Sequence, residues 1–207
     1  MHAFVIKYMR VTILVITLFI YSGTLAQRPF NDSIAFARNN LKQKDMVGLG
    51  SFALVNIASG FIVANSTHGE AKYFWRMNAY WNFFNLGVAG LGYIAARKDL
   101  LKRYSFSENY AKQQKIEKIY VFNAGLDVAY IATGLLLRQK GKLEAGIDSR
   151  DKLNGFGASI TAQGGVLLLM DCAMIALHHK NTVRMGNKLH QIELSAAPGL
   201  FSLTYKL

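Results

Sequence analysis

Four long apolar segments constrain this chain more than any other feature of its sequence. They lie at about residues 46–65, 74–96, 119–138 and 154–177, contain no proline, and are nearly free of lysine and arginine. A helix needs about 20 apolar residues to cross the hydrocarbon layer of a bilayer, because it rises about 1.5 Å per residue. Backbone groups in lipid must also be hydrogen-bonded internally. The segments therefore predict four transmembrane helices.

The connections between these segments are polar and mostly short. Short connections place consecutive helices side by side in opposite directions. We therefore predict an all-α fold, a four-helix transmembrane bundle of two antiparallel hairpins over residues 46–178. A soluble exported bundle is disfavoured, because an aqueous core does not normally need four nearly charge-free segments of this length.

The two ends of the chain carry different signals. Residues 1–26 have two basic residues, an apolar run from Val11 to Tyr21 and small residues before Gln27, which is typical of a cleaved secretory signal peptide. The alternative is an uncleaved anchor that forms a fifth helix. Residues 27–45 are amphipathic and predict a short interfacial helix. Residues 179–207 predict a basic linker and a β-hairpin that turns at Pro198 and Gly199.

The composition restricts the classes of partner that this protein can bind. The formal net charge is +12, 52% of the residues are apolar, and Cys172 is the single cysteine, so an internal disulfide is excluded. No zinc-ligand spacing or RNA-binding signature accompanies the basic residues, which argues against nucleic acid as a partner. We expect the lipid bilayer, including anionic lipid, to be the partner, and a homo-oligomer or an envelope protein partner is left open.

Two rules disagree about orientation. A cleaved signal peptide followed by four spans places both termini on the periplasmic side of a bacterial inner membrane. That side would then carry more lysine and arginine than the cytoplasmic side, which the positive-inside rule disfavours. We give the signal peptide more weight, because the N-terminus is translocated before the later loops are made.

A set of polar side chains inside the predicted spans forms the candidate site. An aspartate near the centre of a membrane helix costs roughly 2.5 to 3.5 kcal/mol on insertion scales, so Asp127 and Asp171 should face the bundle interior. At about 1.5 Å per residue, these aspartates lie roughly 9 to 12 Å from one end of the bundle, and Asn56 and Asn85 roughly 15 to 16 Å. The predicted intramembrane polar cluster is Asp127, Asp171, Asn56, Asn85 and Asn123.

Three interpretations of this cluster are open. The side chains could act as structural hydrogen-bonding groups between helices, as a proton or cation pathway, or as a small-molecule or enzymatic site. Two carboxylates without a nearby cation favour a shared proton or a bound cation. The sequence contains no catalytic motif and no residue set that indicates a cofactor or a metal. A non-enzymatic membrane protein with a structural or interaction role is therefore expected, with a transport or channel subunit as the alternative.

Several motifs resemble those of a family of small bacterial membrane proteins known as a domain of unknown function. They are Leu25-Ala26-Gln27 at the end of the signal, Trp75-Arg76-Met77-Asn78 leading to Trp81-Asn82 and Asn85-Leu86-Gly87, Asn123-Ala124-Gly125-Leu126-Asp127, and Gln163-Gly164 with Asp171. The resemblance covers nearly the whole chain after the signal and implies four helices. It implies no activity, cofactor or site.

Overall fold

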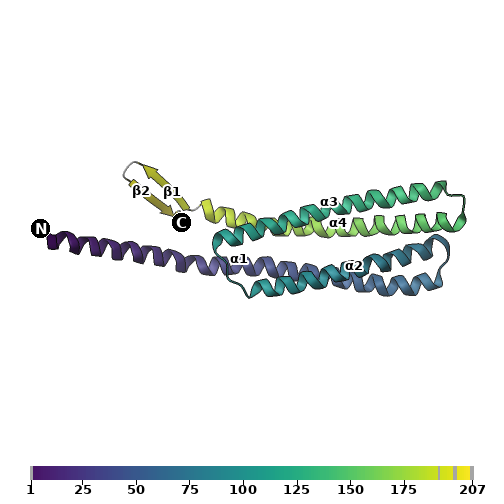
Figure 1. Ribbon diagram of the computed structural model, residues 1–207, viewed down its shortest axis with the longest axis horizontal. Coiled ribbons are helices and arrows are strands. Elements are labelled where there is room, and N and C mark those ends of the chain that lie inside the picture. Colours follow the sequence, from purple (N-terminus) through teal and green to yellow (C-terminus); the bar gives the residue numbers. More distant parts are fainter. Residues whose placement is uncertain (1, 191, 198–199, 206–207) are drawn as a thin grey trace.

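The structure is a computed structural model that describes the backbone of residues 2–190, 192–197 and 200–205 and the side chains of residues 30–188. These residues contain four long helices, α1 (His2–Ser66), α2 (Gly69–Leu100), α3 (Phe106–Leu143) and α4 (Ile147–His190) (Figure 1). Two strands follow, β1 (Ile192–Ala197) and β2 (Leu200–Tyr205), and they pair antiparallel. The prediction of four long helices is confirmed.

The helices form two hairpins that lie side by side. α1 packs along α2 and α3 packs along α4, while α2 lies against α4 and joins the two hairpins (Figure 1). Glycine permits the closest approaches. A Cβ at Gly60 of α1 would lie 2.8 Å from the Ala79 Cβ and from the Trp75 carbonyl oxygen of α2, and a Cβ at Gly164 of α4 would lie 2.9 Å from the Asp127 carbonyl oxygen. These contacts bring the backbones close enough to pack without large side chains between them.

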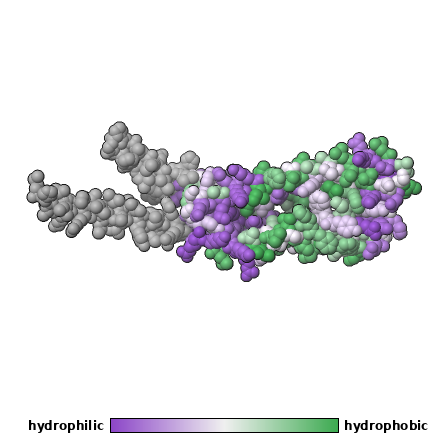
Figure 2. Space-filling view, viewed as in Figure 1, coloured by the Kyte–Doolittle hydropathy of each residue, from purple (hydrophilic) through white to green (hydrophobic). Residues whose placement is uncertain are grey.

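The middle of the bundle is apolar outside and polar inside. Large apolar side chains are exposed there, such as Ile62, Leu91 and Leu169, which are 70%, 74% and 73% exposed. Figure 2 shows hydrophobic residues over the middle of the described surface and hydrophilic residues at its two ends. A surface of this kind suits lipid, because a soluble domain rarely exposes so much contiguous apolar area.

The number of apolar spans differs from the prediction. Three helical segments in the described part of the chain are long and apolar enough to cross a membrane, Phe30–Ser66, Phe106–Leu143 and Ile147–Lys188. The predicted span 74–96 in α2 is not among them. Its asparagines lower the mean hydropathy, yet Asn78, Asn82 and Asn85 are buried against the other helices, while Phe84 and Leu91 face outward.

The helices also run further than the predicted spans. Residues 30–45 do not form a separate interfacial helix, because α1 continues through them and Ile34 and Arg38 are buried in the bundle. α3 starts at Phe106 rather than near residue 119, with Ser105 and Glu108 forming a capping box. α4 continues to His190 through residues predicted as a linker. We call residues 30–45, 97–118 and 178–188 the polar end of the bundle.

Two predictions concern residues whose side chains the structure does not describe. They are the signal peptide at residues 1–26 and the packing of the C-terminal hairpin at residues 192–207. Both stay predictions.

Candidate functional site

A cavity of about 250 Å³ lies between the four helices, beside the polar end. It is partly open and mostly apolar, and its walls include side chains from every helix. Three aspartates from three different helices line it, namely Asp45 of α1, Asp127 of α3 and Asp171 of α4. Asp127 and Asp171 lie within apolar segments and Asp45 lies directly before one, and all three carboxyl groups line the same cavity.

The carboxyl groups influence one another. Asp171 interacts electrostatically with both Asp127 and Asp45, and Asp45 accepts a hydrogen bond from the Tyr120 hydroxyl at 2.7 Å. The Asp127 side chain is 3% exposed, and its Oδ2 is buried without a hydrogen-bond partner among the described residues. An unsatisfied carboxyl oxygen in an apolar bundle is costly, so a ligand, a proton or water is expected to satisfy it.

Aromatic side chains form another part of the cavity wall. Trp81 packs edge-on against Tyr130, with the ring centroids 4.7 Å apart, and Phe84 and Tyr120 add further ring surface. The indole Nε1 of Trp81 is buried and has no hydrogen-bond partner among the described residues. The cavity therefore combines acidic groups, an unused N–H donor and π-faces.

The structure brings four of the five predicted site residues to this cavity. Asp127, Asp171, Asn85 and Asn123 line it, whereas Asn56 does not. Asp45 and Tyr120 also line it, although sequence analysis assigned Asp45 to the interfacial segment. The Asp45 position directly before the first apolar segment is the signal that could have included it.

Asn56 belongs to a second polar group that links three helices. Asn78 of α2 donates to the Asn56 Oδ1 of α1 at 2.7 Å, and Gln163 of α4 donates to the Asn78 Oδ1. Asn82 donates to the Asn78 carbonyl oxygen at 2.8 Å, and Asn85 to the Asn82 Oδ1 at 3.2 Å. Since these amides use one another as partners, the group resembles a structural network more than a binding site.

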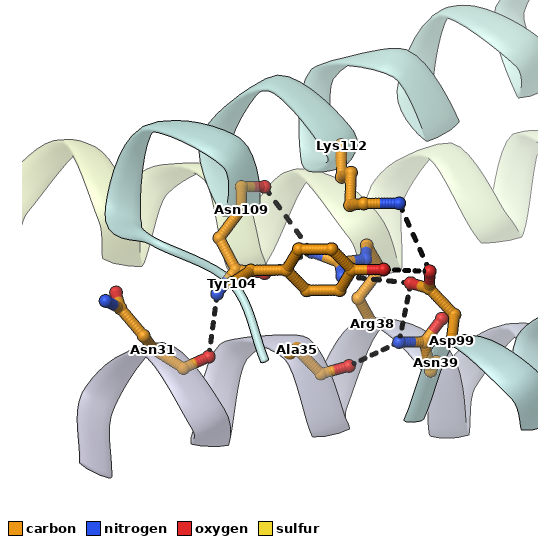
Figure 3. Close-up of polar contacts among 8 residues, drawn as sticks. All are labelled: Asn31, Ala35, Arg38, Asn39, Asp99, Tyr104, Asn109 and Lys112. Carbon is orange, nitrogen blue, oxygen red and sulfur yellow. Dashed lines mark hydrogen bonds and ion pairs between the residues drawn. The ribbon is translucent and has the colours of Figure 1, made fainter. Parts of the chain in front are cut away.

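A third polar group joins α1, α2 and α3 at the polar end (Figure 3). Arg38 of α1, whose side chain is 2% exposed, binds Asp99 Oδ2 at 3.3 Å and Asn109 Oδ1 at 2.8 Å. Lys112 Nζ lies 3.1 Å from Asp99 Oδ1 and over the ring of Tyr104, whose hydroxyl donates to the same oxygen. No sequence signal pairs these residues, because the partners lie on separate helices.

The acidity of Asp99, at the polar end, is also perturbed. Burial would raise the pKa of its carboxyl group, but hydrogen bonds from Tyr104, Lys112 and Asn39 outweigh burial and lower the pKa to about 2. The same contacts act on Tyr104, where burial and the bond to Asp99 raise the pKa of the phenol. Asp99 is therefore ionised at neutral pH and compensates the buried Arg38.

The described residues contain no group of three or more histidine, cysteine, aspartate or glutamate side chains that could hold a metal ion. Cys172, next to Asp171 in the sequence, is exposed on the outer surface of α4 and does not line the cavity.

Comparison with known sequences gives a family without an assigned function. Searches for similar curated proteins and for similar solved structures find no match. A family model matches residues 48–172, which carry every cavity residue except Asp45 and Met46 and exclude Arg38. Since the match covers more than half of the chain, this protein belongs to a family of unknown function (DUF6992).

Proposed function

We propose that this protein is an integral membrane protein that binds a small organic cation in the cavity between its four helices. The observation that carries the proposal is the buried Asp127 carboxyl group, which faces the cavity with one oxygen unpaired among the described residues. Asp171 and Asp45 add negative charge nearby. Three acidic groups in a low-dielectric cavity favour a shared proton or a positively charged occupant.

The aromatic wall supports an organic cation over a bare metal ion. Ammonium groups bind the faces of tryptophan and tyrosine, and the attraction grows when both partners are desolvated. Trp81, Tyr120 and Tyr130 supply such rings beside the carboxyl groups. The volume of about 250 Å³ exceeds that of cavities of about 150 Å³ that hold benzene, so an ammonium ion with several alkyl groups has room.

Membrane insertion of all four helices is part of this proposal. α2 packs on both α1 and α4, so it cannot leave the membrane without the helices that are apolar enough to span it. Its buried asparagines are hydrogen-bonded within the bundle, which removes much of their insertion cost. Its outward face carries Phe83, Phe84, Leu91 and Ile94, which suit lipid.

A structural role has its own support in the amide network around Asn78. Those amides are hydrogen-bonded to one another, although the Gln163 Oε1 is buried without a donor among the described residues. Asp127 differs because it carries an acidic group: its Oδ2 has no donor among the described residues, and its carboxyl group pairs with that of Asp171. If the cavity binds nothing, the structural role is the remaining explanation.

The location and the lipid partner are also proposals. The signal-like residues 1–26 support a bacterial inner membrane with periplasmic termini. Exposed basic side chains at the polar end support contact with anionic headgroups. They are Lys44, Arg97, Lys98, Lys102, Arg103, Lys115, Lys118, Lys180 and Arg184.

The test uses the protein in lipid nanodiscs and tetraethylammonium as the probe. Trp75 and Trp81 are the two tryptophans of the chain, so a Trp75→Phe background leaves Trp81 as the reporter inside the cavity. We expect saturable quenching of Trp81 emission. Asp127→Asn should weaken binding by about 30-fold, the equivalent of about 2 kcal/mol.

The matched control is Asp148→Asn, which removes an exposed carboxyl group at the opposite end of α4. It should leave the affinity unchanged. Absence of saturable binding, or equal affinity of the Asp127→Asn and Asp148→Asn proteins, would overturn the proposed function.

A further inference from the structure

His178 is a buried titratable group that the proposed cation site does not use. Its side chain is 0% exposed, and neither ring nitrogen has a hydrogen-bond partner among the described residues. Burying the two ring nitrogens of His178 without hydrogen bonds costs free energy that an apolar ring would not cost. This cost suggests that the His178 ring exchanges a proton or binds water.

The neighbours of His178 connect it to the cavity. Its ring stacks on Tyr120, with the centroids 5.3 Å apart and the planes inclined by 25°. The Tyr120 hydroxyl donates to Asp45 Oδ2 at 2.7 Å, and both Tyr120 and Asp45 line the cavity. Tyr120 thus contacts His178 through its ring and Asp45 through its hydroxyl.

His178 is also surrounded by charged residues of the polar end, to which it belongs. Burial disfavours the protonated ring most and so lowers its pKa, while Glu117 of α3 attracts the protonated ring and Arg38 and Lys42 of α1 repel it. Glu117 is partly exposed, accepts hydrogen bonds from Gln113 and Thr182, and lies 3.9 Å from the Nδ1 of the exposed His179. Gln113 also donates to the His178 carbonyl oxygen at 2.8 Å, which fixes this turn of α4 against α3.

We propose that His178 carries protons between the polar end and the carboxyl groups of the cavity, by way of Tyr120 and Asp45. In the inward step, the N–H bond of protonated His178 breaks and its proton passes through water to the Tyr120 hydroxyl oxygen. The original Tyr120 proton moves along its hydrogen bond to Asp45, so Tyr120 stays neutral. The reverse step returns the proton and leaves every group as it began.

This inference extends the proposed function, since such a route lets the cavity release protons when a cation enters. The proton route itself does not require a bound cation, because the carboxyl groups of the cavity titrate without one as well. The test is therefore a pH jump without any ligand, followed by stopped-flow fluorescence of Trp81 in the Trp75→Phe background.

We expect a rapid change in Trp81 emission after the jump. Tyr120→Phe removes only the relaying hydroxyl and keeps the ring that stacks on His178, and His178→Phe keeps an aromatic ring at the stacked position. Either change should slow the emission change by about 100-fold. The control His179→Phe alters the neighbouring histidine, which is 64% exposed, and should leave the rate within about twofold of the parent.

Two results would overturn the route. One is an emission change as fast in the Tyr120→Phe and His178→Phe proteins as in the parent. The other is a parent protein whose Trp81 emission responds to pH only as slowly as that of the variants. Tetraethylammonium binding measured separately shows whether the cation site itself stands, so failure of the route and failure of the site are distinguishable.

Discussion

Replacing Asp99 by asparagine should destabilise the polar end more than any other removal of a single charge there. Asp99 accepts from four groups, with Arg38 and Asn39 on Oδ2 and Tyr104 and Lys112 on Oδ1. An asparagine keeps one acceptor oxygen but turns an NH₂ group toward two donors. It also leaves the Arg38 guanidinium, which is 2% exposed, without its counter-charge.

The magnitude follows from this burial. Removing one partner of a buried ion pair costs about 3 to 5 kcal/mol, whereas an exposed pair contributes about 0 to 1 kcal/mol. Arg38 keeps its 2.8 Å hydrogen bond to Asn109, and Asp99 itself is 20% exposed, so we expect the lower end, about 3 kcal/mol.

The assay is unfolding of the purified protein in mixed micelles by denaturant, with Asp148→Asn as the control. Asp148 accepts one hydrogen bond, from Tyr73 at 2.7 Å, in an exposed position, so its loss should cost less than about 1 kcal/mol. Equal destabilisation by the two substitutions would refute the assignment of Asp99 as the counter-charge of a buried arginine.

Three further predictions use the same preparation. Gly60→Val should separate α1 from α2 and lower the free energy of unfolding by about 2 kcal/mol or more. The control is Gly87→Val, where an added Cβ meets nothing within 4 Å, and it should lower the free energy of unfolding by about 1 kcal/mol or less in the same assay. Asn78→Leu removes the amide that joins α1, α2 and α4 and should lower the unfolding free energy by about 1 to 2 kcal/mol; no change would show that the network contributes nothing. Because the pKa of Asp99 falls from its ordinary 3.8 to about 2 on folding, its stabilising contribution is complete above about pH 4 and is lost as the pH falls toward about 2, so the stability difference between the parent and Asp99→Asn should shrink over that range in thermal unfolding.

Length and hydropathy were sufficient to predict the helices but not their ends. The apolar runs give the centre of each helix, because lipid-facing positions need apolar side chains all along a span. They give no information on the polar turns beyond it, since Asn109 and Gln113 are buried by neighbours that only the packed structure supplies. The Ser105 and Glu108 capping box was the local signal for the true start of α3.

Hydropathy also misrepresents α2. An average over a window treats Asn78 and Asn82 as polar surface, although both are buried and hydrogen-bonded. The direction that each side chain faces decides its cost in lipid, and an average contains no direction. The same limit applies to the cavity. The free-energy cost of an aspartate in lipid predicted that Asp127 and Asp171 turn inward. The hydrogen bond from Tyr120 to Asp45 could not be predicted, because it depends on the packing of α3 on α1.

The division into two hairpins has a consequence for how the chain can be assembled. Residues 101–105 alone connect the first hairpin to the second, and each hairpin has its own continuous interface. Two separately translated polypeptides, divided within this connector, could therefore associate in the membrane as a heterodimer through α2 and α4. Such split proteins would allow one half to carry an isotope or a fluorophore while the other remains unlabelled.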